Sequence, residues 1–161
     1  MHINPDHFLE TPEGRRYSHE RNAEAWRLCF GALDDALRAS SPRSTIYLMV
    51  GCQASGKSTW ARAKYREDPN VIIFDAILVK KSERRPVLEA AARHHVPAVA
   101  VWLQTPLEVC VDRNRRRPLD QVVNEQRMRN VFAAVEPPEH SEGFVSVIVL
   151  AYSNDAPTVG S

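Results

Sequence analysis

Residues 51–58, Gly-Cys-Gln-Ala-Ser-Gly-Lys-Ser, fit the spacing G-x-x-x-x-G-K-[ST] of a phosphate-binding loop without a gap. An apolar run, Ile46–Val50, precedes them and a helical pattern over 59–66 follows. The glycines let backbone N–H groups turn inward toward phosphate oxygens, while Lys57 reaches the β- and γ-phosphates and the Ser58 hydroxyl binds Mg²⁺. The predicted nucleotide-binding residues of the loop are Gly51, Cys52, Gln53, Ala54, Ser55, Gly56, Lys57, Ser58 and Thr59.

A second candidate is Asp75, which directly follows the apolar run 71–74. In proteins with a phosphate-binding loop, an aspartate at the end of a neighbouring strand can join the coordination shell of the metal ion. Ser58 and Asp75 are therefore the predicted Mg²⁺-binding residues. The alternative is that Asp75 serves as a helix cap or a turn residue.

Arginines are concentrated at 113–117 (Arg-Asn-Arg-Arg-Arg), directly before Pro118. Their position predicts a helix end or a flap over the nucleotide. Arginines that reach a nucleotide can neutralise the charge that develops during phosphoryl transfer, an effect of roughly 10³–10⁵ in rate. The alternative is a solvated basic helix end that complements the helix dipole.

Composition limits the classes of protein that carry these motifs. The 161 residues are 43% hydrophobic and 25% charged, which is typical of one soluble globular domain and excludes global disorder. A formal net charge of +1 excludes strong, indiscriminate nucleic-acid binding through bulk charge. Three widely spaced cysteines and the lack of a long apolar segment predict a cytoplasmic protein with no membrane contact. No protein partner is predicted.

Strand and helix patterns alternate along the chain, which predicts an α/β fold with helices on both faces of a parallel sheet. Four apolar runs are continuous rather than alternating, as expected of strands buried on both faces. The predicted strands are 2–4, 46–50, 71–74, 98–103 and 145–150. The predicted helices are 18–39, 56–66, 83–94 with Ser82 as N-cap, a fourth that starts with a capping box at Thr105, and 120–135. A single domain is expected over 1–152, with an exposed loop at 10–17 and a flexible tail at 153–161.

The segments 46–62, 72–85, 105–118 and 136–150 resemble the P-loop polynucleotide 5′-hydroxyl kinase family, which groups with AAA-type and zeta-toxin-like small kinases. The resemblance implies a three-layer P-loop NTPase/kinase fold with a five-stranded parallel sheet, and ATP and Mg²⁺ as cofactors. It also implies that Arg113 and Arg117 contact the nucleotide and that Arg117 stabilises charge during transfer. Arg115 and Arg116 have no counterpart in that family's lid.

The chain departs from the family in one large respect. In the family, a strand that carries the catalytic aspartate, and then a helix, lie between the P-loop helix and the strand that here ends at Asp75. Residues 60–70 are too few for both. Residues 3–9 resemble the missing strand end and residues 21–37 the missing helix, so the unit is expected to be transposed ahead of the phosphate loop, giving the strand order 1-3-2-4-5.

In this arrangement Asp6 faces the γ-phosphate across the cleft and takes the proton of the acceptor hydroxyl. The alternative is that Asn-Pro-Asp at 4–6 forms an ordinary turn. The family's substrate-binding arginine corresponds to Leu9 here, and Arg15 or Arg16 is a candidate replacement.

The first functional hypothesis is an ATP-dependent kinase that phosphorylates a hydroxyl group, with the 5′-hydroxyl end of DNA or RNA as the preferred acceptor. Its catalytic residues would be Asp6, Lys57 and Arg117. A small-molecule or nucleoside kinase of the same fold is the second hypothesis, favoured by the near-neutral charge and by Leu9. The third is a non-catalytic nucleotide-binding module that regulates a partner.

Overall fold

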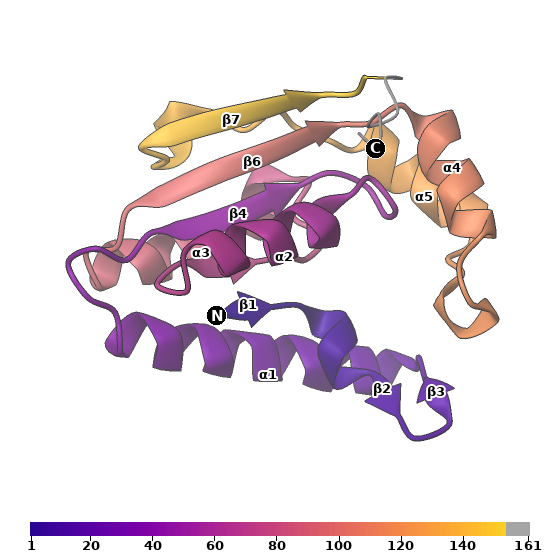
Figure 1. Ribbon diagram of the computed structural model, residues 1–161, viewed down its shortest axis with the longest axis horizontal. Coiled ribbons are helices and arrows are strands. Elements are labelled where there is room, and N and C mark those ends of the chain that lie inside the picture. The colour runs from indigo at the N-terminus through magenta and orange to yellow at the C-terminus, as the bar shows by residue number, and fades with distance from the viewer. Residues whose placement is uncertain (154–161) are drawn as a thin grey trace, which may run out of the picture.

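The computed structural model describes residues 1–153, and its centre is a five-stranded parallel sheet (Figure 1). Across the sheet the strands are β1 (His2–Ile3), β5 (Ile72–Phe74), β4 (Ile46–Val50), β6 (Ala98–Gln104) and β7 (Ser146–Ala151). Numbered along the chain, these strands have the order 1-3-2-4-5, so the predicted order is confirmed. The labels differ because a short hairpin, β2 (Glu10–Thr11) and β3 (Gly14–Arg15), occupies the predicted loop 10–17.

The helices complete a three-layer α/β architecture, the P-loop NTPase/kinase fold that was expected. Three short 3₁₀ turns accompany the five α-helices: η1 (Pro5–Phe8), η2 (Leu119–Gln121) and η3 (His140–Glu142). The α-helices are α1 (His19–Arg38), α2 (Lys57–Glu67), α3 (Lys81–Arg93), α4 (Leu107–Arg115) and α5 (Glu125–Ala133).

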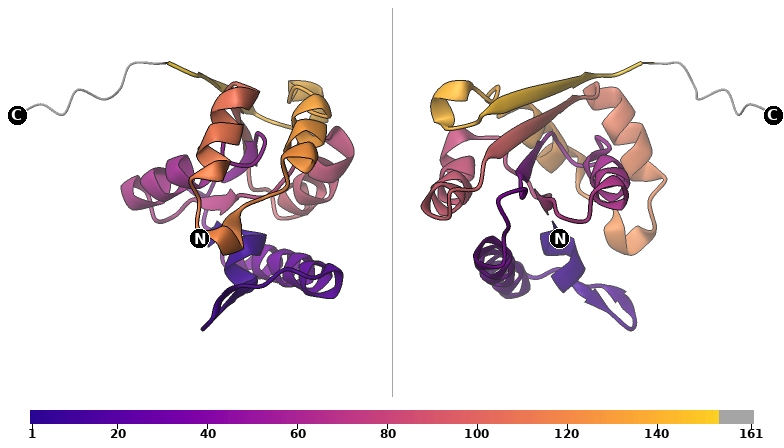
Figure 2. Two further views of the ribbon diagram at one scale, coloured as in Figure 1. Left: turned by 90° about the vertical axis from the view of Figure 1, so that its right-hand side faces the viewer. Right: turned by 60° about the vertical axis from the view of Figure 1, so that its left-hand side comes forward.

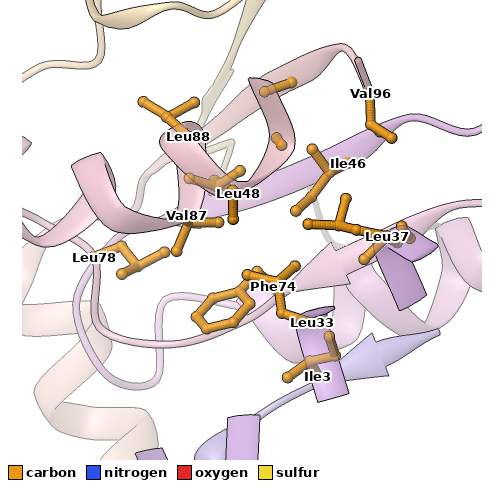
Figure 3. Packing of buried hydrophobic residues seen from close by; sticks show 14 of the residues in the cluster. Ile3, Leu33, Leu37, Ile46, Leu48, Phe74, Leu78, Val87, Leu88 and Val96 are labelled. Atoms are coloured by element: carbon orange, nitrogen blue, oxygen red, sulfur yellow. The ribbon is translucent and has the colours of Figure 1, made fainter. Parts of the chain in front are cut away.

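One face of the sheet is covered by α1 and α3. Leu33 and Leu37 of α1 and Val87 of α3 pack against Leu48 and Phe74 of the sheet (Figure 3). The opposite face is covered by α2, through a smaller cluster that contains Met49, Ala61, Val71, Ile73 and Val101. A third cluster joins α4 and α5 to the phosphate loop through Cys52, Cys110, Val111 and Met128, and the two helices stand side by side in Figure 2.

The expectation that four strands are buried on both faces is wrong for β7. Strand β7 pairs only with β6, at the edge of the sheet, and Val149 is 51% exposed. An edge strand lacks a neighbour on one side, so part of its apolar sequence faces water.

Three predicted helix starts are also wrong, because tertiary contacts compete with local capping signals. Helix α3 begins at Lys81, with Lys80 rather than Ser82 as its N-cap. Thr105 does not cap α4, which has Pro106 as N-cap, since the Thr105 hydroxyl donates to the Ser55 carbonyl at 2.7 Å. Helix α5 begins only after Asn124, whose side chain accepts from the Arg127 N–H.

The first strand and helix dock beside the phosphate loop. Strand β1 pairs with β5 in parallel, with His2 opposite Ile73 and Ile3 opposite Phe74. The Asp75 N–H donates to the Ile3 carbonyl at 2.8 Å, so the pairing continues to the carboxyl end of β5. The carboxyl end of β1, where Asn4 and Asp6 follow, therefore lies at the same edge of the sheet as the loop.

Two further expectations concern the ends and the surroundings of the domain. None of the helices within residues 1–153 is both long and apolar enough to cross a membrane. The tail predicted at 153–161 lies, apart from Ser153, outside the described residues.

A buried arginine of α3 joins the connection that follows β5 to the one that follows α5. Arg84 of α3 is fully buried, and its guanidinium makes a bidentate ion pair with Glu142 at 2.8 and 3.0 Å. The same group donates to the carbonyls of Leu78, Val79 and Glu136 at 3.0–3.1 Å. All three guanidinium nitrogens thus donate hydrogen bonds that join α3 to the connections that follow β5 and α5.

Replacing Arg84 with methionine should therefore destabilise the fold strongly. The Arg84→Met variant leaves the largely buried Glu142 carboxylate without its cation and removes a donor from three carbonyls, which should lower the free energy of unfolding by about 3–5 kcal/mol. Arg85→Met is the matched control, because Arg85 is exposed on the same helix. Urea unfolding of both variants measures the difference, and a loss below about 1 kcal/mol for Arg84→Met would contradict the assignment.

Candidate functional site

The phosphate loop connects β4 to α2 in the geometry that its sequence predicts. Gly56 has φ of +105° and occupies the N-cap position of α2, a left-handed conformation that favours glycine. A Cβ atom at Gly51 would lie 2.7 Å from Ser55 Oγ, so this position also requires glycine. Both glycines are needed to curl the backbone around the start of the helix.

Lys57 lies in the centre of this loop. Its side chain is 8% exposed, and Nζ donates to the carbonyls of Gly51 at 2.9 Å and Cys52 at 2.8 Å. Burial lowers the pKa of Lys57, against the opposing influence of the Asp75 carboxylate. A buried cation beside backbone donors is suited to binding the oxygens of a polyphosphate.

Two polar atoms of the loop lack a hydrogen-bond partner among the described residues, and one of them supports this interpretation: the Ser55 hydroxyl can donate to a phosphate oxygen, whereas Gln53 Oε1 can only accept, for example from water. Among residues 1–153, Gln53 Oε1 and Ser55 Oγ are buried side-chain atoms without a hydrogen-bond partner. Leaving a buried polar group unpaired costs about 1–3 kcal/mol, so such groups are expected to meet a ligand or water. The loop therefore fits a nucleotide phosphate chain.

Ser58 and Asp75, the predicted Mg²⁺-binding pair, are in direct contact. Ser58 Oγ donates to Asp75 Oδ2 at 2.6 Å, and the same oxygen lies 2.9 Å from His2 Nε2 and 3.0 Å from Asn4 Nδ2. Burial would raise the pKa of Asp75, but the hydrogen bonds from His2 and Ser58 and the charge of Lys57 together lower it. The carboxylate is therefore held ionised.

The donor set at this pair fits Mg²⁺. A hydroxyl and a carboxylate are hard oxygen ligands, and Mg²⁺ is commonly held by one or two carboxylates together with substrate phosphates. The part of the chain that the structure describes contains no cluster of three or more His, Cys, Asp or Glu residues that could hold a metal ion alone. Ser58 and Asp75 would thus hold the ion jointly with the nucleotide.

Asp6 faces the same cleft from the N-terminal segment that follows β1. Asp6 lies in η1, its side chain is 48% exposed, and Oδ2 forms an ion pair with Arg15 Nη1 at 3.0 Å. The cleft has a volume of about 1080 Å³, and Asp6, Lys57 and Ser58 all line it. This volume reaches the upper end of the range for ligand pockets, roughly 300–1,000 Å³. There is thus room for a nucleotide and a second molecule.

The two arginines that the family resemblance singles out both line the cleft. Arg113 Nη1 donates to the Ala54 carbonyl at 3.4 Å, and its guanidinium lies 5.8 Å from the centre of the Tyr152 ring. Burial lowers the pKa of Arg117, while the charge of Asp6 opposes this shift. The structure therefore brings Arg117 near both Asp6 and the phosphate loop.

The other arginines of the run point elsewhere. Arg115 forms an ion pair with Glu125, and Arg116 forms one with Asp112. Both side chains are exposed and neither lines the cleft. These contacts agree with the solvated role expected for these two arginines.

Of the two candidate acceptor-binding arginines, only Arg15 reaches the cleft. Its guanidinium bridges Asp6 and Glu10, with Nη2 at 2.8 Å from Glu10 Oε1. Arg16 is 63% exposed and pairs with Glu13 outside the cleft. Leu9, at the family's arginine position, is 3% exposed and belongs to the core.

The hairpin β2–β3 and the adjoining Tyr17 also contact the lid, which comprises residues 107–133 from α4 through η2 to α5. The sequence did not indicate these contacts. The Arg15 N–H donates to Asp120 Oδ2 at 2.7 Å. The Arg127 guanidinium lies 5.5 Å from the ring centre of Tyr17, and Nη2 donates to the Tyr17 hydroxyl at 3.4 Å. The N-terminal unit and the lid thus meet across the cleft.

Two cysteines connect the phosphate loop to the lid. Cys52 of the loop and Cys110 of α4 are buried in the same apolar cluster. The neighbouring Cys110 thiol, helped by the charges of Lys57 and Arg117, lowers the pKa of Cys52, whereas the Cys52 thiol together with burial raises the pKa of Cys110. Loop and lid helix are therefore packed as one unit.

Sequence reasoning missed His2 and Asn4, which complete the surroundings of Asp75. A signal was present, because the predicted strand order places the first strand beside the strand that ends at Asp75. The carboxyl ends of adjacent parallel strands meet at one edge of the sheet, where ligands bind. Polar residues within the first strand were therefore candidates for this site.

Comparison with known proteins also indicates the class of P-loop, kinase-like proteins. A family model described as an AAA domain matches residues 62–138, just under half of the chain. A search of curated proteins found no match. The matched range begins inside α2, after the phosphate loop, so the loop geometry and the family match are separate observations. Together they support a P-loop kinase-like family, and the chain has a P-loop nucleotide-binding fold.

Lys57 should be required for nucleotide binding. Lys57→Met removes the buried cation without changing the length of the side chain greatly. Losing one partner of a buried charge pair costs roughly 2–5 kcal/mol, so affinity for ATP–Mg²⁺ should fall about 30-fold or more. Lys64→Met is the matched control, because Lys64 lies on the same helix but outside the cleft. Calorimetric titration compares the two, and unchanged affinity in Lys57→Met would rule out the assigned role.

Asp75 should contribute a pH-dependent part of the stability. Its pKa is lowered from the ordinary 3.8 on folding, so its ionised form stabilises the protein above that value, and the contribution is lost as the pH falls through the lowered pKa. Asp75→Asn cannot ionise. Its deficit in free energy of unfolding should therefore be largest above about pH 5 and shrink toward about pH 3. Urea unfolding across this range tests the sign, which a pH-independent deficit would refute.

Proposed function

We propose that the protein is an ATP- and Mg²⁺-dependent phosphotransferase that moves the γ-phosphate of ATP to a hydroxyl acceptor, with a polynucleotide 5′-hydroxyl end as the first candidate. The observation that carries the proposal is the position of Asp6 in the cleft that Lys57 and Ser58 line. A nucleotide-binding module without transfer activity has no need of a carboxylate on the acceptor side of that cleft.

Each residue has a role that follows from its placement. The backbone of the loop and Lys57 hold the β- and γ-phosphates, and Ser58 with Asp75 would hold Mg²⁺, which neutralises phosphate charge. The Asp6 carboxylate accepts the proton of the acceptor hydroxyl as its oxygen attacks the γ-phosphorus. Arg117 stabilises charge on the phosphoryl group in transit.

Arg15 is the proposed acceptor-side positioning residue. Its guanidinium holds Asp6 and Glu10 at once, which fixes the direction of the Asp6 carboxylate. A bidentate cation in this place can also bind an anionic group of the acceptor, such as a phosphate next to a 5′-hydroxyl. Arg16, paired outside the cleft, has no part in the proposal.

A small-molecule or nucleoside acceptor is the second candidate, and one observation favours it. The contacts of Arg15 with Asp120 and of Tyr17 with Arg127 span the acceptor side of the cleft. A long polymer would have to pass beneath or displace them, whereas a small acceptor would not.

A transfer assay with labelled ATP separates the candidates. It compares 5′-hydroxyl DNA and RNA oligonucleotides with nucleosides and small alcohols, each between about 50 and 200 mM salt. Phosphorylation of oligonucleotides that declines steeply with salt supports the first candidate, while salt-insensitive transfer to a small acceptor supports the second. ATP binding without transfer to any acceptor would leave only the nucleotide-binding module.

Asp6→Asn tests the proposed general base. Turnover should fall by roughly 10²–10⁴ because the amide cannot take the acceptor proton, while ATP affinity should change little. Asp35→Asn is the matched control, since Asp35 is exposed on α1 and does not line the cleft. Single-turnover kinetics with the best acceptor supplies the rate, and full activity in Asp6→Asn would remove Asp6 from the mechanism.

A further inference from the structure

Asn4 is the one residue within 1–153 whose side chain hydrogen-bonds both to the metal-binding pair and to the turn that carries Asp6. It is 8% exposed and directly follows β1. Its Nδ2 group donates to Asp75 Oδ2 at 3.0 Å and lies 3.4 Å from Ser58 Oγ. Its Oδ1 atom accepts from the Asp6 N–H at 2.9 Å, which caps η1.

We propose that Asn4 is a positioning residue that couples the metal-binding residues Ser58 and Asp75 to the Asp6 carboxylate. This inference rests on the proposed function for its catalytic consequence. A carboxamide is suited to the task, because a donor and an acceptor lie at a fixed separation on one planar group. The Nδ2 group donates to Asp75, so the orientation of the Asn4 side chain depends on that carboxylate. The Oδ1 atom accepts from the Asp6 N–H and so fixes the first turn of η1.

The backbone leaves the Asn4 side chain little freedom. Asn4 has φ of −143° and ψ of 127°, the extended conformation to which a residue before proline is restricted. On one side, the hydrogen bond from Asp75 to the Ile3 carbonyl fixes the strand. On the other, Pro5 is buried and begins η1. A shift of Asp75 is therefore passed to Asp6 rather than absorbed by the chain.

His2 provides the comparison that separates coupling from simple support of the metal pair. His2 Nε2 contacts the same Asp75 oxygen at 2.9 Å, but no hydrogen bond joins its side chain to η1. The His2 ring also packs edge-on against the His7 ring of η1, with ring centres 5.0 Å apart, but it makes no hydrogen bond to the Asp6 N–H. Loss of His2 should therefore disturb the metal-binding pair and leave the hydrogen bond to the Asp6 N–H in place, whereas loss of Asn4 should disturb both.

The kinetic test compares Asn4→Ala, Asn4→Ser and His2→Ala at increasing Mg²⁺. Removing a group that orients a metal ligand typically costs about 10–100-fold in metal affinity or activity. Both alanine variants should need more Mg²⁺ for ATP binding, measured by calorimetry without acceptor. At saturating Mg²⁺, His2→Ala should recover kcat, while Asn4→Ala should stay about tenfold or more below wild type with acceptor KM unchanged.

Asn4→Ser keeps a side-chain oxygen that can cap η1 but is too short to reach Asp75 as Asn4 does. It should share the raised Mg²⁺ requirement of Asn4→Ala yet recover part of the lost kcat. Recovery of wild-type kcat by Asn4→Ala at saturating Mg²⁺ would overturn the coupling. So would a normal Mg²⁺ requirement in that variant.

A binding readout keeps this inference separate from the proposed function. In wild type and His2→Ala, Mg²⁺ with ADP should slow hydrogen exchange at the Asp6 amide, because the ordered metal pair holds Asn4 against η1. In Asn4→Ala this slowing should be lost although the protein remains folded by thermal unfolding. If wild type transfers phosphate to no acceptor, the proposed function fails, and the exchange result alone decides the coupling. Equal slowing in Asn4→Ala would overturn it.

Discussion

The pairing of β1 with β5 is the constraint on which the whole site depends, and it is a short one. Two residues of β1 take part, and their few hydrogen bonds contribute about 0.5–1.5 kcal/mol each. The placement of β1 is secured mainly by α1, whose Leu33 and Leu37 are 1% exposed against the sheet. Burial of such side chains contributes about 1.5–3 kcal/mol each, so the helix holds the strand in place.

This arrangement explains how a strand–helix unit at the amino end can serve a site built around a loop at residues 51–58. In a parallel α/β sheet, side chains at the carboxyl ends of the strands form the site whatever the order of the connections. The connection from α2 to β5 is short, and β5 lies directly beside β4. Strand β1 lies on the other side of β5. This position brings Asn4 to Asp75 and Asp6 to the cleft.

Much of this fold could be predicted from the sequence, because its strongest signals are local. The continuous apolar runs that became β4, β5 and β6 and the spacing of Gly51, Gly56 and Lys57 each specify a conformation without help from distant residues. The strand order also followed once residues 3–9 were compared with a family pattern.

The remaining features depend on contacts between distant residues, and local patterns could not reveal them. Thr105 looked like a helix cap because capping is the default use of threonine before proline, but the Ser55 carbonyl competes for its hydroxyl. The contact of the Arg15 N–H with Asp120, 105 residues away in sequence, has no local signal, whereas the β2–β3 hairpin itself pairs locally, Glu10 with Arg15. The Asn-Pro-Asp pattern predicts a turn, which η1 confirms, but it does not reveal that the Asn4 side chain also reaches Asp75.

The contacts that span the cleft are of a kind that can open. Arg127 and Tyr17 are exposed, and exposed polar contacts of this sort are worth about 0–1 kcal/mol. Asn114, by contrast, is fully buried and exchanges two hydrogen bonds with Val123, at 2.7 and 2.9 Å, which fixes the base of the lid. A lid with a rigid base and weakly held tip can admit an acceptor and then close over it. Under the proposed function, an acceptor on its way to Asp6 would therefore have to pass between the segment that carries Asp120 and Arg127 and the β2–β3 hairpin.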